Sequence, residues 1–260
     1  MESAMVWTKW EMGWPWFCLG GALVLSVVML FTNAMRSQPA VSRWWDPVWL
    51  SWLVVPMLML HMFEEYGFDV LGRTYILPET ICTNLGYPPY PDCPIPIAHY
   101  PLINLGIAWA FAPLAALLAR RSLVIGLSWY GLLIANGILH LVATLVGEFQ
   151  AGSGVLTGAL LFIPGFFWMV YVVLKSHAMS GMALAVSIAG GIVAHILLGA
   201  AVGLQKIGAY GSTGVLVFDL AVIVAPISVG WVGSKLLRPR AVLAAGRPMS
   251  VIGTFQMCHI

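Results

Sequence analysis

Charged side chains are scarce in this sequence: only 8% of its 260 residues are Asp, Glu, Lys or Arg, whereas 60% are hydrophobic. An ordinary soluble domain is about a quarter charged. This composition, with a mean hydropathy of +0.91, excludes such a domain. The basic residues are scattered among predicted loops and form no basic face, so we expect no nucleic-acid partner.

Motifs of several common enzyme classes are also absent. The sequence has no phosphate-binding loop, dinucleotide fingerprint or serine-nucleophile elbow, and no CxxC or zinc-finger spacing. Of its four cysteines, Cys82 and Cys93 are close enough to form a disulfide. Sequence constrains disulfide pairing weakly, so whether they pair stays open.

Long apolar segments make up most of the chain. A transmembrane helix needs about 20 mostly apolar residues. Seven segments qualify, centred on residues 14–34, 46–63, 101–119, 122–146, 154–174, 179–204 and 211–233. The predicted fold class is therefore all-α, a polytopic bundle of about seven transmembrane helices in an integral membrane protein. Residues 1–235 form one domain, and residues 236–260 form a basic tail that would bind anionic lipid.

The distribution of Lys and Arg predicts the orientation. Nine of these residues follow odd-numbered segments and three lie on the other side. Because cytoplasmic loops are enriched in Lys and Arg, this places the N-terminus outside and the C-terminus in the cytoplasm. Residues 66–100 then form a long outer loop, and whether it is a lid or a binding surface stays open.

The most informative motif is His61-Met62-Phe63-Glu64-Glu65, at the end of the second apolar segment. On a helix, positions i, i+3 and i+4 share a face, so His61 can stand beside both glutamates. A nitrogen ligand beside carboxylate oxygens suits a divalent metal or a proton relay. The structural alternative is that the glutamates are solvated at the membrane edge while His61 packs between helices.

Further polar residues interrupt the later segments: Asn104, Asn136, His140, His195 and Asp219. Buried polar groups in a membrane are costly and mark functional sites. With the predicted topology, all five fall in the outer half of the bundle together with the first motif, which predicts a shared pocket. The alternatives are that His195 is a hydrogen-bonded packing residue and that Asp219 only interacts with a helix N-terminus.

These residues suggest one mononuclear metal site and its surroundings. The predicted metal ligands are His61, Glu65 and His140, a set that suits zinc and also iron or manganese. The predicted catalytic residues are Glu64, Glu65 and Asp219. The remaining polar residues are expected to contact substrate or support the ligands: Asn104, Asn136, Glu148 and His195.

Over roughly residues 50–175 the chain resembles the HXXEE-domain family of bacterial membrane proteins. The resemblance rests on His61-Met62-Phe63-Glu64-Glu65 and on Asn136-Gly-Ile-Leu-His140, followed by Gly154, Thr157 and Pro164. It implies a bacterial cytoplasmic membrane protein with a site at these residues, but no particular reaction. The long loop at residues 66–100 and two additional segments after residue 178 depart from the family pattern.

Three functions compete. The first is a metal-dependent enzyme that acts on a membrane lipid or isoprenoid-like hydrophobic substrate, either by hydrolysis with Glu64 as general base or by oxidation at iron. The second is a non-catalytic membrane subunit or homo-oligomer, with the small residues of the sixth segment contacting a partner. The third is a carrier for protons or metal ions. The sequence argues against it, because no series of polar residues leads from the predicted pocket to the cytoplasmic side.

Overall fold

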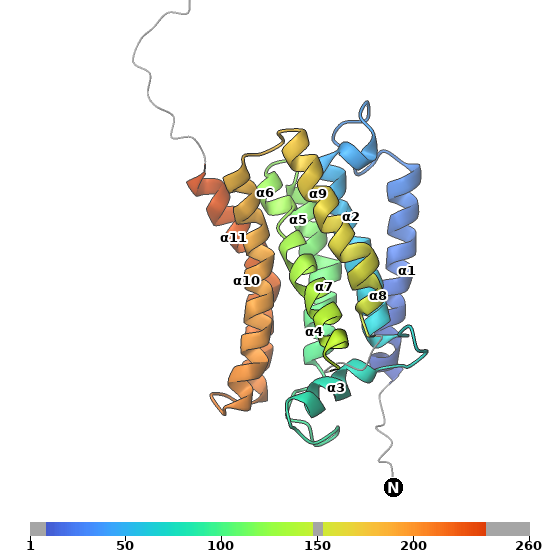
Figure 1. Ribbon diagram of the computed structural model, residues 1–260, viewed down its shortest axis with the longest axis vertical. Coiled ribbons are helices and arrows are strands. Elements are labelled where there is room, and N and C mark those ends of the chain that lie inside the picture. The colour runs from blue at the N-terminus through green and yellow to red at the C-terminus, as the bar shows by residue number, and fades with distance from the viewer. Residues whose placement is uncertain (1–8, 148–152, 238–260) are drawn as a thin grey trace, which may run out of the picture.

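In a computed structural model of the protein, residues 9–147 and 153–237 are described, and this part of the chain is helical without strands (Figure 1). The longer α-helices are α1 (Lys9–Phe31), α2 (Pro47–Tyr66), α7 (Tyr130–Leu145), α9 (Ile163–Lys175), α10 (Gly181–Lys206) and α11 (Ser212–Leu236). The shorter ones are α3 (Ile76–Asn84), α4 (His99–Leu105), α5 (Ala112–Leu118), α6 (Leu123–Gly126) and α8 (Val155–Thr157). A 3₁₀ turn, η1 (Arg43–Trp45), and two π-helical segments, η2 (Gly106–Phe111) and η3 (Gly158–Phe162), complete the set.

The described residues contain seven helices that are long and apolar enough to cross a membrane, which confirms the predicted fold class. These spans are Gly13–Phe31, Pro47–Tyr66, His99–Leu118, Leu123–Leu145, Val155–Lys175, Gly181–Lys206 and Ser212–Leu236. The third and fifth spans each contain a π-helical segment. π-Bulges of this kind are frequent at functional sites, and η3 lies next to the candidate site described below.

The segment at residues 66–100 is partly helical and closed by a disulfide. It contains α3 and lies at the end of the bundle where α2 ends (Figure 1). Cys82 and Cys93 are bonded, with their Cα atoms 6.1 Å apart. The disulfide therefore holds α3 against the segment that leads into α4. The predicted tail falls almost wholly on residues 238–260, and Glu148 is likewise outside the described residues.

The second span is the central helix of the bundle. Within its apolar window 78% of the residues are buried, against 28% for the first span. Its N-terminus is fixed by Asp46, whose carboxylate accepts hydrogen bonds from the backbone of Ser37, Gln38 and Val48. Burial would raise the pKa of Asp46, but these hydrogen bonds outweigh burial and hold the pKa below its usual value. Pro47 follows at the first helical position, where its fixed φ suits the helix.

Helices α7 and α10 cross at two glycines and diverge beyond them. A Cβ atom built on Gly131 would lie 1.8 Å from the carbonyl oxygen of Ile188, and one built on Gly191 would lie 2.2 Å from the amide nitrogen of Leu132. Only glycine permits this approach. The small residues at the centre of α10 are thus used for packing inside the chain. Toward the end of the bundle that carries α3, the two helices separate around the cavity described next (Figure 1).

Candidate functional site

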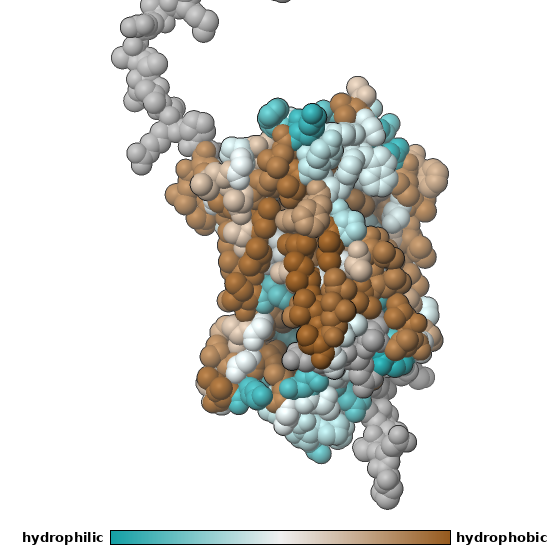
Figure 2. All heavy atoms as spheres, in the orientation of Figure 1, coloured by the Kyte–Doolittle hydropathy of each residue, from teal (hydrophilic) through white to brown (hydrophobic). Residues whose placement is uncertain are grey.

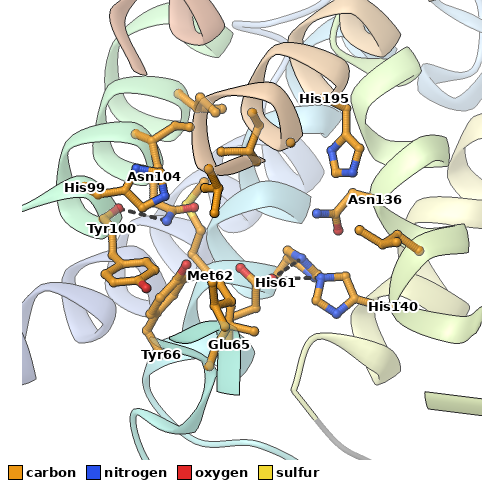
Figure 3. Close-up of a pocket in the computed structure, with 18 of the residues that line it drawn as sticks. His61, Met62, Glu65, Tyr66, His99, Tyr100, Asn104, Asn136, His140 and His195 are labelled. Atoms are coloured by element: carbon orange, nitrogen blue, oxygen red, sulfur yellow. Dashed lines mark hydrogen bonds and ion pairs between the residues drawn. The ribbon is translucent and has the colours of Figure 1, made fainter. Parts of the chain in front are cut away.

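Two histidines and one carboxylate converge at the end of α2. His61 and Glu65 lie one turn apart on α2, and His140 reaches them from α7. The Oε1 atom of Glu65 is 3.1 Å from Nε2 of His61 and 2.9 Å from Nε2 of His140 (Figure 3). All three side chains are buried. This burial overturns the alternative in which the glutamates of the motif are solvated at the membrane edge.

The other ring nitrogen of each histidine is held by an oxygen atom. Nδ1 of His140 lies 2.8 Å from the backbone carbonyl of Ser153, which can only accept a hydrogen bond. Nδ1 of His61 lies 2.7 Å from Oγ1 of Thr157, and this hydroxyl donates its own hydrogen to Glu64. Both Nδ1 atoms must therefore carry a hydrogen. In the neutral rings the Nε2 lone pairs then point at the same carboxylate oxygen.

The carboxylate of Glu64 points away from the three candidate metal ligands and toward the fifth span. Its carboxylate accepts hydrogen bonds from the backbone amides of Leu156, at 2.8 Å, and Thr157, at 2.7 Å. The Thr157 hydroxyl adds a third bond of 2.5 Å. The residue thus satisfies exposed amides at the start of the fifth span, as an N-cap would. This arrangement differs from the general-base position predicted for Glu64, because its oxygens are occupied by the fifth span.

Gly154 closes the site from the fifth span. Its φ is +72°, and a Cβ atom built on it would lie 2.7 Å from Cε1 of His61 and 2.8 Å from Cε1 of His140. Both the backbone conformation and the close approach to the imidazole rings therefore require glycine. The rings are packed edge to face with centroids 4.9 Å apart, and Phe162 lies 4.4 Å from the ring of His61.

The donor set fits a divalent metal ion. One ligand atom from each of His61, Glu65 and His140 lies within 4.8 Å of the others, and Nε2 of His61 has no hydrogen-bond partner among the described residues. A cation shared by these three atoms, either a metal ion or the proton of an imidazolium, makes their close approach favourable. Two histidines and one carboxylate are the ligands of catalytic zinc and of mononuclear iron sites. The hydrogen bonds to both Nδ1 atoms are the support that metal-bound imidazoles receive.

The site opens into a cavity of about 490 Å³ between the helices. Its walls are mostly apolar, with residues such as Leu58, Ile103 and Leu132, and α10 forms one side. Leu139 and Gly199 line the cavity and are also exposed, so it reaches the surface between α7 and α10. Figure 2 shows hydrophilic atoms in this position, between the brown surfaces of the two helices.

Two further polar atoms near the metal ligands have no partner in the described part of the chain. Oδ1 of Asn136 and Nδ1 of His195 are buried without a hydrogen bond, and both residues line the cavity above His140 (Figure 3). Nδ1 of His195 therefore lacks, among the described residues, the hydrogen bond that the alternative prediction assumed. Unsatisfied buried polar atoms cost about 1–3 kcal/mol each. Their position beside the same cavity suits the polar group of a ligand.

A second buried histidine–carboxylate pair lies on the other side of the cavity. Nδ1 of His99, at the start of α4, is 2.9 Å from each carboxylate oxygen of Asp219 in α11. The predicted residue Asp219 thus contacts the cavity only through His99, to which the sequence assigned no role. His99 follows a proline-rich loop, and its only sequence signal was its place at the border of an apolar segment.

The structure brings most of the predicted site residues together. Those that line the cavity are His61, Glu65, Asn104, Asn136, His140 and His195. The amide of Asn104 donates a hydrogen bond to the backbone carbonyl of Tyr100. Ser153, Gly154 and Thr157 hold the two ligand histidines in place, and of these only Gly154 and Thr157 belong to the sequence resemblance noted above.

The family comparison coincides with this site. Residues 52–169 match the model of a family described as a protein of unknown function with HXXEE motif. The match confirms the resemblance predicted from the motif, and the matched segment contains all three candidate ligands and the residues that hold them. Helices α10 and α11 lie outside it. No curated protein and no solved structure matches the chain significantly.

Proposed function

We propose that this chain, with its HXXEE-family segment, is a membrane-embedded metal-dependent enzyme that acts on a lipid or isoprenoid-like substrate. The observation that carries the proposal is the shared orientation of two imidazoles. His61 and His140 each commit Nδ1 to an oxygen and present Nε2 to Oε1 of Glu65. A metal ion bound by both Nε2 atoms and by Oε1 of Glu65 would satisfy this arrangement.

A metal bound there would act as a Lewis acid beside an apolar cavity. Zinc would favour hydrolysis and iron would favour oxidation of a hydrocarbon chain. His61, Glu65 and His140 would hold the ion. Glu64 holds the fifth span against the site and becomes a positioning residue in this proposal, in place of the general base that the sequence predicted.

The cavity supports a substrate with an apolar body and a polar end. Its apolar walls would bind a hydrocarbon chain, whose burial contributes about 0.8 kcal/mol per CH₂ group. The unsatisfied atoms of Asn136 and His195 would bind the polar group next to the metal. Because the cavity reaches the surface between α7 and α10, such a substrate can enter sideways from the lipid.

The charge distribution supports an outer location for this site. The described basic residues at the end of the bundle away from α3 are Arg36, Arg43, Arg120, Arg121, Lys175 and Lys235 (Figure 1). At the end that carries α3 they are Lys9, where α1 begins, Arg73 and Lys206. By the positive-inside rule the first end is cytoplasmic. We therefore place the N-terminus, the disulfide and the metal site on the outer side of the membrane, the oxidising side in bacteria.

Elemental analysis of the detergent-purified protein tests the proposal. We expect about one equivalent of zinc, iron or manganese, lost in His61→Ala and in His140→Ala. His177→Ala is the matched control, because His177 is exposed beyond the end of α9 and far from the site in sequence and space. Circular dichroism and size-exclusion chromatography should show that all three variants fold. Absence of metal after reconstitution with each ion would overturn the metal-dependent mechanism.

A further inference from the structure

The His99–Asp219 pair differs from a simple structural ion pair because one edge of the imidazole faces the cavity. Asp219 is fully buried in α11 and binds Nδ1 of His99 with both carboxylate oxygens. No described residue forms a hydrogen bond with Nε2. The ring itself lines the cavity. Nε2 is therefore the polar atom that this side of the cavity offers to a ligand.

The arrangement resembles the part of a catalytic triad that moves a proton. A buried carboxylate bound to Nδ1–H fixes the tautomer in which Nε2 accepts a proton, and it stabilises the imidazolium that results. The surroundings are apolar on the cavity side, with Ile103, Leu198 and Val202 among the lining residues. In such surroundings a hydrogen bond to Nε2 is stronger than in water.

We propose that His99, oriented by Asp219, binds and deprotonates a hydroxyl group of an amphiphilic ligand at the side of the cavity away from His140 (Figure 3). The ligand class is a long-chain phenol. This choice rests on the proposed function, from which we take it that the cavity binds an amphiphile. The hydroxyl O–H bond breaks and an Nε2–H bond forms. The electron pair stays on the oxygen, and Asp219 balances the new charge on the imidazolium.

A substitution can remove the proton acceptor while keeping the contact with Asp219. In His99→Asn the side-chain amide takes the place of Nδ1 and can still donate to Asp219, but nothing replaces Nε2. Asp219→Asn keeps the shape of the pair and removes the negative charge that stabilises the imidazolium. Asp219 is thus a positioning residue, whereas His99 touches the ligand.

The probe is a nitrophenol carrying an octyl chain, because its phenolate absorbs visible light where tryptophan does not. The experiment uses metal-depleted full-length protein in detergent, at a pH where the probe in empty micelles is mostly protonated. Native mass spectrometry measures binding of the probe to each variant. We expect wild-type protein to raise the phenolate-to-phenol ratio at least about tenfold, the effect of one pKa unit in the probe.

The variants decide whether His99 is responsible. His99→Asn should bind the probe but return the ratio to the micelle value, and Asp219→Asn should lower it in part. His177→Asn, at an exposed histidine that does not line the cavity, should leave it unchanged. A ratio that survives in His99→Asn, or that falls equally in His177→Asn, would overturn the proposal, as would failure of the wild type to bind the probe. Metal analysis of each variant before depletion reports on the metal centre separately, so the two proposals can fail independently.

Discussion

Two buried groups of histidine and carboxylate face one cavity, and they differ in how many nitrogens share a carboxylate. At the first, Nε2 atoms of two histidines meet a single oxygen of Glu65, and both Nδ1 atoms are already bound elsewhere. At the second, one Nδ1 of His99 meets both oxygens of Asp219. In the first group two nitrogens converge on one carboxylate oxygen, whereas in the second the carboxylate binds one nitrogen and leaves the other for a ligand.

The comparison shows how similar residues can support different chemistry. Convergent lone pairs favour a metal ion, whereas a single imidazole with a carboxylate behind it favours proton transfer. The first group lies wholly within the segment that matches the HXXEE family, and the second joins that segment to α11 outside it. The matched segment thus contains the candidate metal ligands and His99, and the helices outside it contribute Asp219 and one wall of the cavity.

The largest expected effect is a difference in metal binding between two variants, in each of which one of the two carboxylates is replaced by an amide. Glu65→Gln removes a ligand and should weaken metal binding by more than about 100-fold, beyond the range of outer-shell substitutions. Asp219→Asn should leave the metal stoichiometry of the purified protein unchanged, because within the described residues the carboxylate of Asp219 binds the other histidine, His99. Competition with a chromophoric chelator measures both affinities. Equal losses in the two variants would show that the groups act as one site.

The sequence predicted the first group because its spacing is local. His61, Glu64 and Glu65 share one helix, and His140 stands out as a titratable residue within an apolar segment. Helical periodicity could not separate the two glutamates, since both i+3 and i+4 face His61. The different roles of the two glutamates depend on where the fifth span begins. Glu64 binds the first backbone amides of that span, whereas Glu65 contacts the histidines.

The second group could not be predicted in the same way. His99 and Asp219 are 120 positions apart, and their contact follows from the packing of α4 against α11. Ser153 contributes a backbone carbonyl, for which residue type carries no signal. The number of spans and the all-α class depend only on apolar length, and the sequence therefore predicted them correctly.

A smaller but still large effect is expected from Gly154→Ala. The added methyl group would overlap both imidazole rings, because its carbon would lie only 2.7 Å from Cε1 of His61. The rings must then separate, and metal affinity should fall about 100-fold. Gly147→Ala is the matched control, because Gly147 has a similar φ of +75° but no atom within 4 Å of the built Cβ. Both variants carry the strain of a left-handed backbone, about 1–2 kcal/mol, so a loss of metal confined to Gly154→Ala isolates the contact with the rings.

The smallest expected effect concerns the hydroxyl of Thr157. Thr157→Val keeps the shape of the side chain but removes the oxygen that accepts from Nδ1 of His61 and donates to Glu64. His61 would then lose the bond that fixes its tautomer, and metal affinity should fall about 10- to 100-fold. Thr157→Ser restores the hydroxyl and should recover most of the affinity in the same chelator competition. The probe signal assigned to His99 should stay at its wild-type value in both variants, since Thr157 does not line the cavity. If Thr157→Val lowered that signal while sparing metal affinity, the division of labour between the two groups would have to be reversed.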